Sequence, residues 1–504
     1  MREILAMDLG STQLKLMLLD ENLQVVASVS EGYPTQTPCP GWLEQKPEDW
    51  VRAMERGLEK LRAIHGWEHL AAVGFSGHMS GAVLLNRDGA VLHPCIMLAD
   101  ARSEKQCAEI RQRAGALIQK RTGNPVINAF TLPKLLWLKQ ERPQVWQEAV
   151  TWVSPKDYLR FLLTDSLLTD TTDAYNSLCL TGEPPVWDRE ILEAAGLEKD
   201  KFPQVREPDE FAGRITPKAA ARFGLPAGVP VFAGGADMAC GAVGMGLYHP
   251  RTAALTLGTC ATFLLPVEGV DSRAFGQVTF HRHGVKGLYY ALGSHFNGGL
   301  AVNWAGSMLS RDGKLDFKRI AELSEQAAAV PPGSWGVLTL PFLAGSGSPW
   351  FDPRDRQTVM GITAATTQGE LFRSQLEGIT MNLEQTRRLF DRMAPGGVDS
   401  ILLGGGGVKV SVWPQMIADV FGVPIRQVVN SDASTLGAAI LAGAGAGIFP
   451  DMRRAAEISQ TVEGEREPDK AAHAAYKTLY KKYETSYDLV RRLYWEGEAP
   501  ENEY

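Results

Sequence analysis

Two short segments, far apart in the chain, each place a glycine beside hydroxyl side chains. Residues 7–12 read Met-Asp-Leu-Gly-Ser-Thr, and residues 256–259 read Thr-Leu-Gly-Thr. Each lies between two apolar runs, a pattern that predicts a strand, a tight turn and a second strand. The backbone N–H groups of a glycine turn can bind phosphate oxygens because no side chain holds the anion away. Either segment alone could be an ordinary turn, but the duplication predicts two hairpins that grip a polyphosphate.

Two other phosphate-binding motifs do not fit these segments. A Rossmann loop must open a helix directly after its glycines. Here residues 13–19 continue as a β-rich run instead. A Walker loop requires a Gly-Lys-Ser/Thr sequence, which is not found at the right place.

Asp237 is a candidate for proton transfer. It follows residues 230–236, Pro-Val-Phe-Ala-Gly-Gly-Ala, and precedes a run of small residues. This pattern predicts a strand, a glycine turn and a helix that begins near Asp237. A carboxylate fixed there and open to a cleft could act as a general base. A helix N-cap is the alternative, because aspartate is a favoured capping residue.

Asp8 and two glycine-rich turns add candidate sites for a metal and a nucleotide. Asp8 closes an apolar strand at the first hairpin, where it could hold Mg²⁺ directly or through water. Its alternative role is to hydrogen-bond its own turn. The run Gly404–Gly407 would allow a flat or phosphorylated ligand to approach the backbone. Residues 434–439, Ser-Thr-Leu-Gly-Ala-Ala, could cover the other side of a nucleotide.

Length and composition limit the kinds of protein that this chain can be. At 504 residues it exceeds one ordinary hydrophobic core, so two domains are expected, divided near residues 249–250. A net charge of −7 argues against nucleic-acid binding. The first twenty residues do not resemble a signal peptide, and no apolar run has the length of a membrane span. The six cysteines have no zinc-ligand spacing and suit a reduced cytoplasm.

Five elements must position these residues. Alternating β-rich and helical runs predict an α/β unit in each half of the chain. Helices are predicted over residues 50–64 and 369–392, and strands over 71–75 and 400–403. Residues 470–494 carry tyrosines at helical spacing, which predicts a closing helix that packs on the second domain.

Six motifs, taken in their order, resemble those of the FGGY carbohydrate kinases, and within that family those of the xylulose kinases. The resemblance covers nearly the whole chain. The motifs are Asp-Leu-Gly-Ser-Thr at 8–12, Gly-Phe-Ser-Gly-His-Met-Ser-Gly at 74–81, Ala-Phe-Thr-Leu-Pro-Lys-Leu-Leu-Trp at 129–137, Gly-Gly-Ala-Asp at 234–237, Leu-Gly-Thr at 257–259 and Gly-Gly-Gly-Val-Lys at 405–409.

The resemblance implies an α/β fold of two ribonuclease-H-like domains, the actin-like ATPase fold, around a deep cleft. Residues 1–248 would form the N-terminal domain, with the sugar site, the first phosphate loop and the catalytic aspartate. Residues 249–504 would form the ATP-binding domain. Asp237 would be the general base and contact the sugar, and Asp8 would be the acid associated with Mg²⁺. The other sugar-binding residues implied are His78, Met79, Ser80 and Asp100. The nucleotide-binding residues implied are Gly10, Ser11, Thr12, Lys15, Gly258, Thr259, Gly299, Asn303, Gly406 and Gly407.

Several departures from the family pattern fall at the sugar site. Xylulose kinases commonly have Gln-Met-His-Gly where residues 78–81 read His-Met-Ser-Gly, and Trp-Asn-Asp where 98–100 read Leu-Ala-Asp. Met238 replaces a polar residue, and Gly345–Pro349 lacks the charged pair of the family loop. Losing a polar contact to a buried hydroxyl changes substrate discrimination by a large factor.

The predicted function is therefore ATP-dependent phosphorylation of a sugar hydroxyl, with a ketopentose such as xylulose as acceptor and Mg²⁺ and ATP as cofactors. The alternatives are another ketose or polyol (ribulose, an erythritol-type polyol or gluconate), a catalytically silent sugar-binding regulator, and an actin-like ATPase without a sugar. The expected partner is a small-molecule sugar, and no nucleic acid or membrane is expected to bind. The expected location of the protein is the cytoplasm, and a homodimer is left open.

Overall fold

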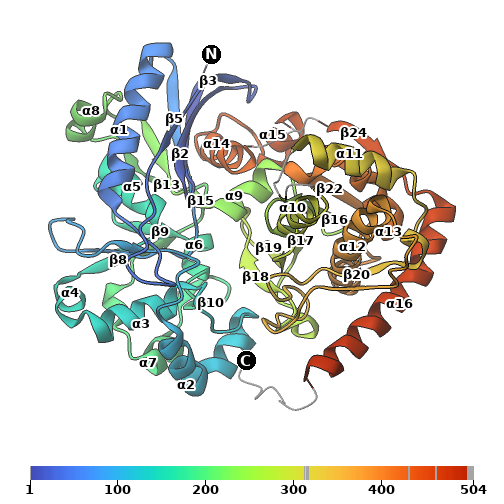
Figure 1. The fold of residues 1–504 in the computed structure, drawn as a ribbon. Coiled ribbons are helices and arrows are strands. Elements are labelled where there is room, and N and C mark those ends of the chain that lie inside the picture. Colours follow the sequence, from blue (N-terminus) through green and yellow to red (C-terminus); the bar gives the residue numbers. More distant parts are fainter. Residues whose placement is uncertain (1, 311–312, 314–316, 429–431, 460–461, 496–504) are drawn as a thin grey trace. The chain divides into compact units, whose positions relative to one another are not determined.

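The computed structural model describes residues 2–310, 313, 317–428, 432–459 and 462–495 (Figure 1). The chain forms two compact units. The first contains Met1–Tyr248, Phe280–Tyr289 and Asp432–Gln460, and the second contains His249–Thr279, Tyr290–Ser431 and Thr461–Tyr504. A late segment of the chain thus completes the first unit.

A mixed sheet forms the centre of the first unit. Its strands run in the order β13-β14-β5-β1-β2-β3, with β15 also paired to β5. β1 is antiparallel to β2 and parallel to β5, and β5 is parallel to β14 and β15. The strands are β1 (Glu3–Leu9), β2 (Gln13–Asp20), β3 (Val25–Gly32), β5 (Leu70–Gly77), β13 (Phe211–Arg214), β14 (Pro230–Phe232) and β15 (Gly235–Ala236).

Helices cover both faces of this sheet, which explains why β1 is apolar at nearly every position. Leu5 and Met7 belong to one core with Trp50 and Leu58 of α1 (Pro47–Ile64). Ile4 and Ala6, which point the other way, belong to a second core with α14 (Ala433–Gly445). In Figure 1 the late helix α14 lies beside the early strands of the first unit.

The second unit repeats this strand arrangement. Its strands run in the order β19-β17-β16-β22-β23-β24. β16 is antiparallel to β17 and parallel to β22, β22 is parallel to β23, and β23 is antiparallel to β24. The strands are β16 (Thr252–Leu257), β17 (Ala261–Val267), β19 (Tyr289–His295), β22 (Ser400–Gly404), β23 (Ile425–Val428) and β24 (Val462–Arg466). Each unit therefore begins with a hairpin whose first strand is central.

The last helix, α16 (Lys470–Trp495), packs within the second unit, as the sequence predicts. Four of its tyrosines are buried, namely Tyr476, Tyr480, Tyr483 and Tyr487. Tyr476 Oη donates to Glu377 of α12 (Gln368–Met393) at 3.0 Å, and Tyr487 Oη donates to Asp355 at 2.7 Å. The helix thus closes the unit through hydrogen bonds as well as apolar contacts.

The remaining elements surround these cores. In the first unit they are α2 (Glu104–Thr122), α3 (Thr131–Glu141), α4 (Pro143–Glu148), α5 (Pro155–Thr164), α6 (Thr171–Tyr175), α7 (Arg189–Ala195), α8 (Pro217–Phe223), α9 (Asp237–Gly244), α15 (Met452–Ser459), β4 (Glu44–Gln45), β6 (Val83–Leu85), β7 (Cys95–Ile96), β8 (Thr151–Val153), β9 (Leu168–Asp170), β10 (Leu180–Thr181), β11 (Val186–Trp187) and β12 (Gln204–Arg206). In the second they are α10 (Gly299–Met308), α11 (Phe317–Ala328), α13 (Trp413–Phe421), β20 (Leu338–Leu340) and β21 (Thr358–Met360), while β18 (Thr279–Arg282) spans a division between the units. All six cysteines are free thiols. Within the described ranges, no helix has the length and apolarity needed to cross a membrane.

Two glycines allow α14 to pack closely against its neighbours. A Cβ on Gly437 would lie 1.8 Å from the carbonyl oxygen of Cys240 in α9, and a Cβ on Gly74 of β5 would lie 2.2 Å from the carbonyl oxygen of Ala438. Both obstacles are backbone atoms, which cannot rotate away. Gly437 therefore allows α14 to approach the backbone of α9, and Gly74 allows β5 to approach the backbone of α14.

We expect Gly437→Ala to lower the free energy of unfolding by at least about 2 kcal/mol, because the new methyl group forces α9 and α14 apart. The intrinsic helix preference for alanine, about 1 kcal/mol, acts in the opposite direction and is smaller. Gly241→Ala in α9 is the matched control, since a Cβ there would meet no atom within 4 Å. Urea unfolding of both variants measures the difference, and equal stabilities would show that the close packing is unimportant.

Candidate active site

Two acids lie at the same edge of the first unit's sheet. Asp8 pairs with Ser76 in the register of β1 and β5, and Gly235 pairs with Ser76 from the other side of β5. Asp237 follows β15 directly and is the first residue of α9. Because β1, β5 and β15 are parallel, both carboxylates lie at the carboxyl ends of strands, where ligands bind in α/β folds.

Asp237 is a partly buried carboxylate with a raised proton affinity. Its Oδ1 accepts a hydrogen bond from the Met238 N–H at 2.8 Å, and the N-cap position of α9 is Ala236. Burial, with a smaller effect of the negative charge of Asp8, raises the pKa of Asp237 to about 7, although the Met238 hydrogen bond acts in the opposite direction. A carboxyl group with this pKa can accept a proton from an alcohol at neutral pH.

One oxygen of Asp8 is held by the chain and the other is left available. Oδ2 accepts hydrogen bonds from Ser434 Oγ at 2.6 Å and from Thr435 Oγ1 at 3.4 Å. Oδ1 is buried and has no hydrogen-bond partner. A buried, unpaired carboxylate oxygen is unfavourable unless a ligand satisfies it. The donor set therefore fits Mg²⁺ or a water molecule bound to it.

The first predicted phosphate turn has the expected hairpin geometry. The Gly10 N–H donates to Gln13 O at 3.0 Å and closes the turn between β1 and β2. Ser11 and Thr12 are exposed at its tip. Lys15 lies opposite Asp8 in the hairpin and forms an ion pair with Asp432. The hydroxyls and backbone of the turn are thus accessible, while the Lys15 ammonium already has a carboxylate partner.

The predicted sugar turn presents buried polar atoms that lack partners. His78 is buried, and neither of its ring nitrogens has a hydrogen-bond partner. Burial, with a smaller effect of Lys134, lowers the pKa of His78 to about 4, so the ring is neutral at pH 7. Ser80 has a left-handed backbone (φ 65°), and its Oγ is also buried without a partner. A neutral imidazole and a hydroxyl can both donate to and accept from sugar hydroxyls. Met79, between them, is buried and apolar.

Lys134 holds the backbone of this turn by hydrogen bonds, a role that the sequence does not predict. Its Nζ donates to the carbonyl oxygens of Ser80 at 3.1 Å, Ala129 at 3.3 Å and Phe130 at 3.2 Å. Burial lowers the pKa of Lys134 to about 7. Three converging carbonyls satisfy the ammonium hydrogens. In the sequence, Lys134 is noticeable only as part of the motif at 129–137, and that motif does not show that the side chain is buried.

Asp100 is occupied by an ion pair. Its carboxylate accepts from the Arg102 side chain, with Oδ2 2.7 Å from Nη2 and Oδ1 2.8 Å from Nε, and from the Leu43 N–H at 2.5 Å. Arg102 also lies over the ring of Trp42, with its Cζ 3.9 Å from the ring centroid. Both carboxylate oxygens of Asp100 thus have partners within the chain, and its contact with sugar stays a prediction.

The second predicted phosphate turn lies in the second unit. Gly258 O accepts from the Gly299 N–H at 2.7 Å, and Thr259 O accepts from the Leu300 N–H at 2.9 Å. A Cβ on Gly407 would lie 2.6 Å from the Cβ of Leu257, so this glycine run packs directly against the end of β16. The structure thus gathers Gly258, Thr259, Gly299, Gly406 and Gly407 around one turn, and Asn303 lies exposed one helical turn after Gly299.

The predicted site residues divide between the two units. Asp8, Gly10, Ser11, Thr12, Lys15, His78, Met79, Ser80, Asp100 and Asp237 belong to the first, and Gly258, Thr259, Gly299, Asn303, Gly406 and Gly407 belong to the second. Ser434 and Thr435, expected beside a nucleotide, belong to the first unit and bind Asp8.

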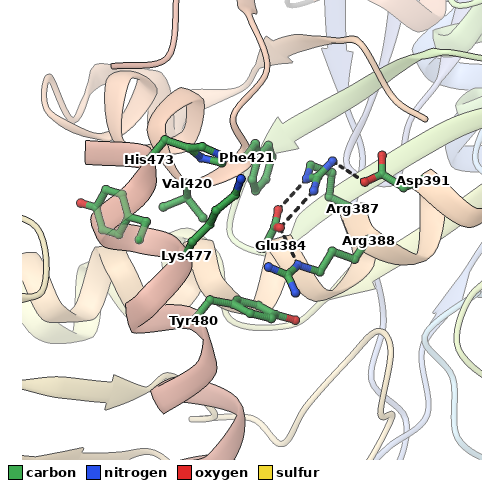
Figure 2. A pocket seen from close by; sticks show the side chains of 10 residues that line it. Glu384, Arg387, Arg388, Asp391, Val420, Phe421, His473, Lys477 and Tyr480 are labelled. Carbon is green, nitrogen blue, oxygen red and sulfur yellow. Dashed lines mark hydrogen bonds and ion pairs between the residues drawn. The ribbon is translucent and has the colours of Figure 1, made fainter. Parts of the chain in front are cut away.

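A separate pocket of about 380 Å³ lies in the second unit, between α12, α13 and α16 (Figure 2). Its charged groups largely pair with one another: Arg387 bonds Glu384 and Asp391, and Arg388 bonds Glu384 at 2.8 Å. The pocket contains none of the predicted site residues.

Comparison with known proteins identifies the family. The model of the FGGY family of carbohydrate kinases matches residues 3–244 for its N-terminal domain and 253–446 for its C-terminal domain. The xylulose kinase of Bacillus subtilis (strain 168) is 32% identical over 496 residues, 98% of this chain and 97% of that protein. A xylulose kinase structure from Brucella ovis aligns with a TM-score of 0.89 at 28% identity, over 98% of this chain and all of that one. The gluconate kinase structure from Lactobacillus acidophilus aligns with a TM-score of 0.90 at 26% identity, over 98% of this chain and 99% of that one.

These matches confirm the resemblance seen in the six motifs and the fold expected from it. Both units have mixed sheets with the same strand pattern, and the solved relatives align over nearly the whole chain. The chain belongs to the FGGY family of carbohydrate kinases, is xylulose-kinase-like within it, and has the actin-like ATPase fold.

Proposed function

We propose that this kinase transfers the γ-phosphoryl group of Mg-ATP to a hydroxyl of a ketopentose such as xylulose, with Asp237 as the general base. The observation that carries this proposal is the Asp237 carboxyl group. It lies with Asp8 at one edge of the sheet and has a pKa of about 7. The choice of a ketopentose is supported by relatives named xylulose kinase.

In the proposed reaction, Asp237 takes the proton of the attacking hydroxyl. A bond forms between that oxygen and the γ-phosphorus, the bond from phosphorus to the β,γ-bridging oxygen breaks, and ADP leaves. Positioning and charge neutralisation supply most of the catalysis in such transfers. One carboxylate of suitable pKa is therefore enough for the proton.

The metal and the nucleotide have candidate ligands on the chain. Asp8 Oδ1 would hold Mg²⁺ or its water, and the ion would neutralise phosphate charge. Gly10, Ser11, Thr12 and Lys15 would bind phosphate from the first unit. Gly258, Thr259, Gly299, Asn303, Gly406 and Gly407 would bind nucleotide from the second. A cytoplasmic location and a homodimer remain further parts of this proposal.

The acceptor would be recognised by groups that now lack partners. His78 can donate one hydrogen bond and accept another, and the Ser80 hydroxyl can do the same. These groups differ from the usual xylulose-kinase residues at this turn. The similarity to a gluconate kinase structure makes an aldonate the second candidate acceptor.

A substrate panel tests the proposal. ADP release from Mg-ATP is measured with ketopentoses, ketohexoses, aldonates and polyols, and the phosphorylated product is identified by mass spectrometry. We expect turnover with a ketopentose well above the sugar-free rate. Turnover with gluconate instead would support the second candidate. Sugar binding without turnover would indicate a silent regulator, and equal turnover without sugar would indicate an ATPase.

A further inference from the structure

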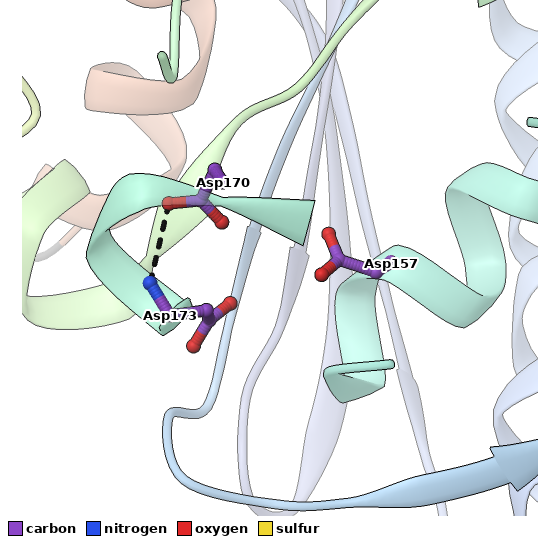
Figure 3. A group of neighbouring side chains, drawn as sticks. All are labelled: Asp157, Asp170 and Asp173. Atoms are coloured by element: carbon purple, nitrogen blue, oxygen red, sulfur yellow. Dashed lines mark hydrogen bonds between the residues drawn. The ribbon is translucent and has the colours of Figure 1, made fainter. Parts of the chain in front are cut away.

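A buried cluster of charges lies behind the turn that carries Asp237. Asp157, Asp170 and Asp173 converge, each buried, from α5, β9 and α6 (Figure 3). Their ligand atoms lie within 4.8 Å of one another, close enough to surround a metal ion. The charges of this cluster must be balanced because burial removes their hydration.

The chain supplies its own cation to this cluster. Lys156 Nζ lies 2.5 Å from Asp157, 2.6 Å from Asp170 and 3.2 Å from Asp173. Arg160, one helical turn later on α5, lies 2.5 Å from Asp157. The lysine ammonium thus occupies the position that a metal would need.

The charges balance when one acid is protonated. Lys156 and Arg160 face three carboxyl groups. Burial, together with the charges of Asp170 and Asp157, raises the pKa of Asp173 well above its usual value. Burial alone would raise the pKa of Asp157 too, but Arg160 and Lys156 lower it below its usual range. These opposite shifts favour a proton on Asp173 over a proton on Asp157.

Two members of this cluster hold the turn before Asp237 from one side. Arg160 Nη1 donates to the Ala233 carbonyl at 2.7 Å. Asp170 Oδ1 accepts from the Thr172 hydroxyl, and that hydroxyl accepts from the Ala236 N–H at 2.8 Å. The ammonium of Lys156 is therefore linked by three short contacts to the backbone next to Asp237.

The strand β5 holds the same turn from the other side. Gly234 has φ 72°, and a Cβ there would lie 2.1 Å from the Phe75 carbonyl oxygen. Gly235 pairs with Ser76, and Ala236 with Gly77. The turn is thus fixed between a rigid strand and a hydrogen-bonded ion cluster, which leaves Asp237 little freedom.

A buried ion cluster contributes little net stability, because the cost of desolvating its charges offsets their attraction. Fixed geometry is a different benefit, since a displacement of about 1 Å at a catalytic group can slow a reaction about 100-fold. We infer that Thr172 and Arg160 are positioning residues, which transmit the fixed geometry of the Lys156 cluster to the general base Asp237. This inference rests on the proposed role of Asp237.

Thr172→Val is the sharpest test, because it removes the hydroxyl and keeps the shape of the side chain. We expect kcat to fall about 10- to 100-fold while the KM for sugar stays within about twofold, since Thr172 acts through Asp237 rather than on the sugar. Thr172→Ser, which keeps the hydroxyl, should restore most of the rate. Thr172→Val combined with Asp237→Asn should be no slower than Asp237→Asn alone, because residues that act through one group are not additive.

Thr122→Val is the matched control. Thr122 is equally buried in the first unit, and its hydroxyl donates to Ile118 O at 2.8 Å, away from the turn. If Thr172→Val does not fold, Arg160→Lys tests the same idea, because an ammonium cannot reproduce the guanidinium contacts with Asp157, Ala233 and Leu168.

Three results would overturn the inference: a kcat for Thr172→Val within twofold of wild type, an equal loss in Thr122→Val, or a double variant that is slower than Asp237→Asn by the full factor. An active Asp237→Asn enzyme would instead contradict the proposed function itself, so the two failures are distinguishable.

Discussion

Replacing Asp237 by asparagine should reduce kcat about 1,000-fold, because a positioned general base contributes about 10²- to 10⁴-fold. Asparagine has nearly the same size and still accepts the Met238 hydrogen bond, but it cannot take a proton. Sugar binding, measured by calorimetry, should change little. A variant that retains more than about a tenth of the wild-type kcat would contradict the assignment of Asp237.

The pH dependence of kcat/KM is a second test of the role of Asp237. Burial and Asp8 raise the pKa of Asp237 to about 7, so kcat/KM of the wild-type enzyme should fall with a slope of one below about pH 7, where the base becomes protonated. Asp209→Asn is the matched control, since burial also raises the pKa of Asp209. That variant should keep both the rate and the pH profile.

As the pH rises through 7, the contribution of Asp237 to stability should fall while its contribution to activity rises. A folded-state pKa raised above the unfolded value contributes stability that is fully present below about pH 4 and lost as the pH rises through 7. Asp237→Asn should therefore unfold at the same temperature as wild type, or a higher one, at pH 8. Such a result would show that the inactive variant is folded.

Asp8→Asn should have the second largest effect. Losing the carboxylate charge should lower kcat/KM for Mg-ATP about 100-fold and raise the required Mg²⁺ concentration about 10- to 100-fold. The remaining activity should extend to lower pH, because the negative charge of Asp8 helps to raise the pKa of Asp237. A Mg²⁺ titration at fixed ATP, followed by a pH profile at excess Mg²⁺, measures both effects.

Asp20→Asn is the control for Asp8. Asp20 lies at the opposite end of the same hairpin, and its Oδ1 accepts from the N–H groups of Asn22 and Gln24, which an amide oxygen can also do. An unchanged Mg²⁺ requirement in Asp8→Asn would exclude a metal role for Asp8.

The sequence predicted the regular elements well where apolar periodicity was long. The helices predicted over 50–64, 369–392 and 470–494 occur as α1, α12 and α16, and the strand predicted over 71–75 occurs as β5. Their ends differ by a few residues, since end positions depend on caps and pairing partners rather than on periodicity. The assignment of α14 to the first unit could not be foreseen, because it follows from tertiary contacts with β1 and α9, which apolar periodicity does not reveal.

In the candidate site too, the sequence does not reveal roles that depend on tertiary contacts of side chains. Asp8, Asp237 and the glycine turns stand out because their residue types are unusual next to apolar strands. Lys134, Thr172 and Gln45 do not, since lysine, threonine and glutamine side chains normally lie in solvent. Only the fold reveals that Gln45 is buried and donates to Ser11 O at 2.7 Å.

The return of Asp432–Gln460 to the first unit also bears on how the protein is made. A ribosome that has completed Tyr248 has not yet produced α14, which covers one face of the central sheet. Roughly 180 further residues must emerge first, which takes about 10 to 40 s at about 5 to 20 residues per second. During that interval the apolar face of β1 and β5 is exposed on the nascent chain, so folding of the first unit should depend on chaperones that bind such surfaces.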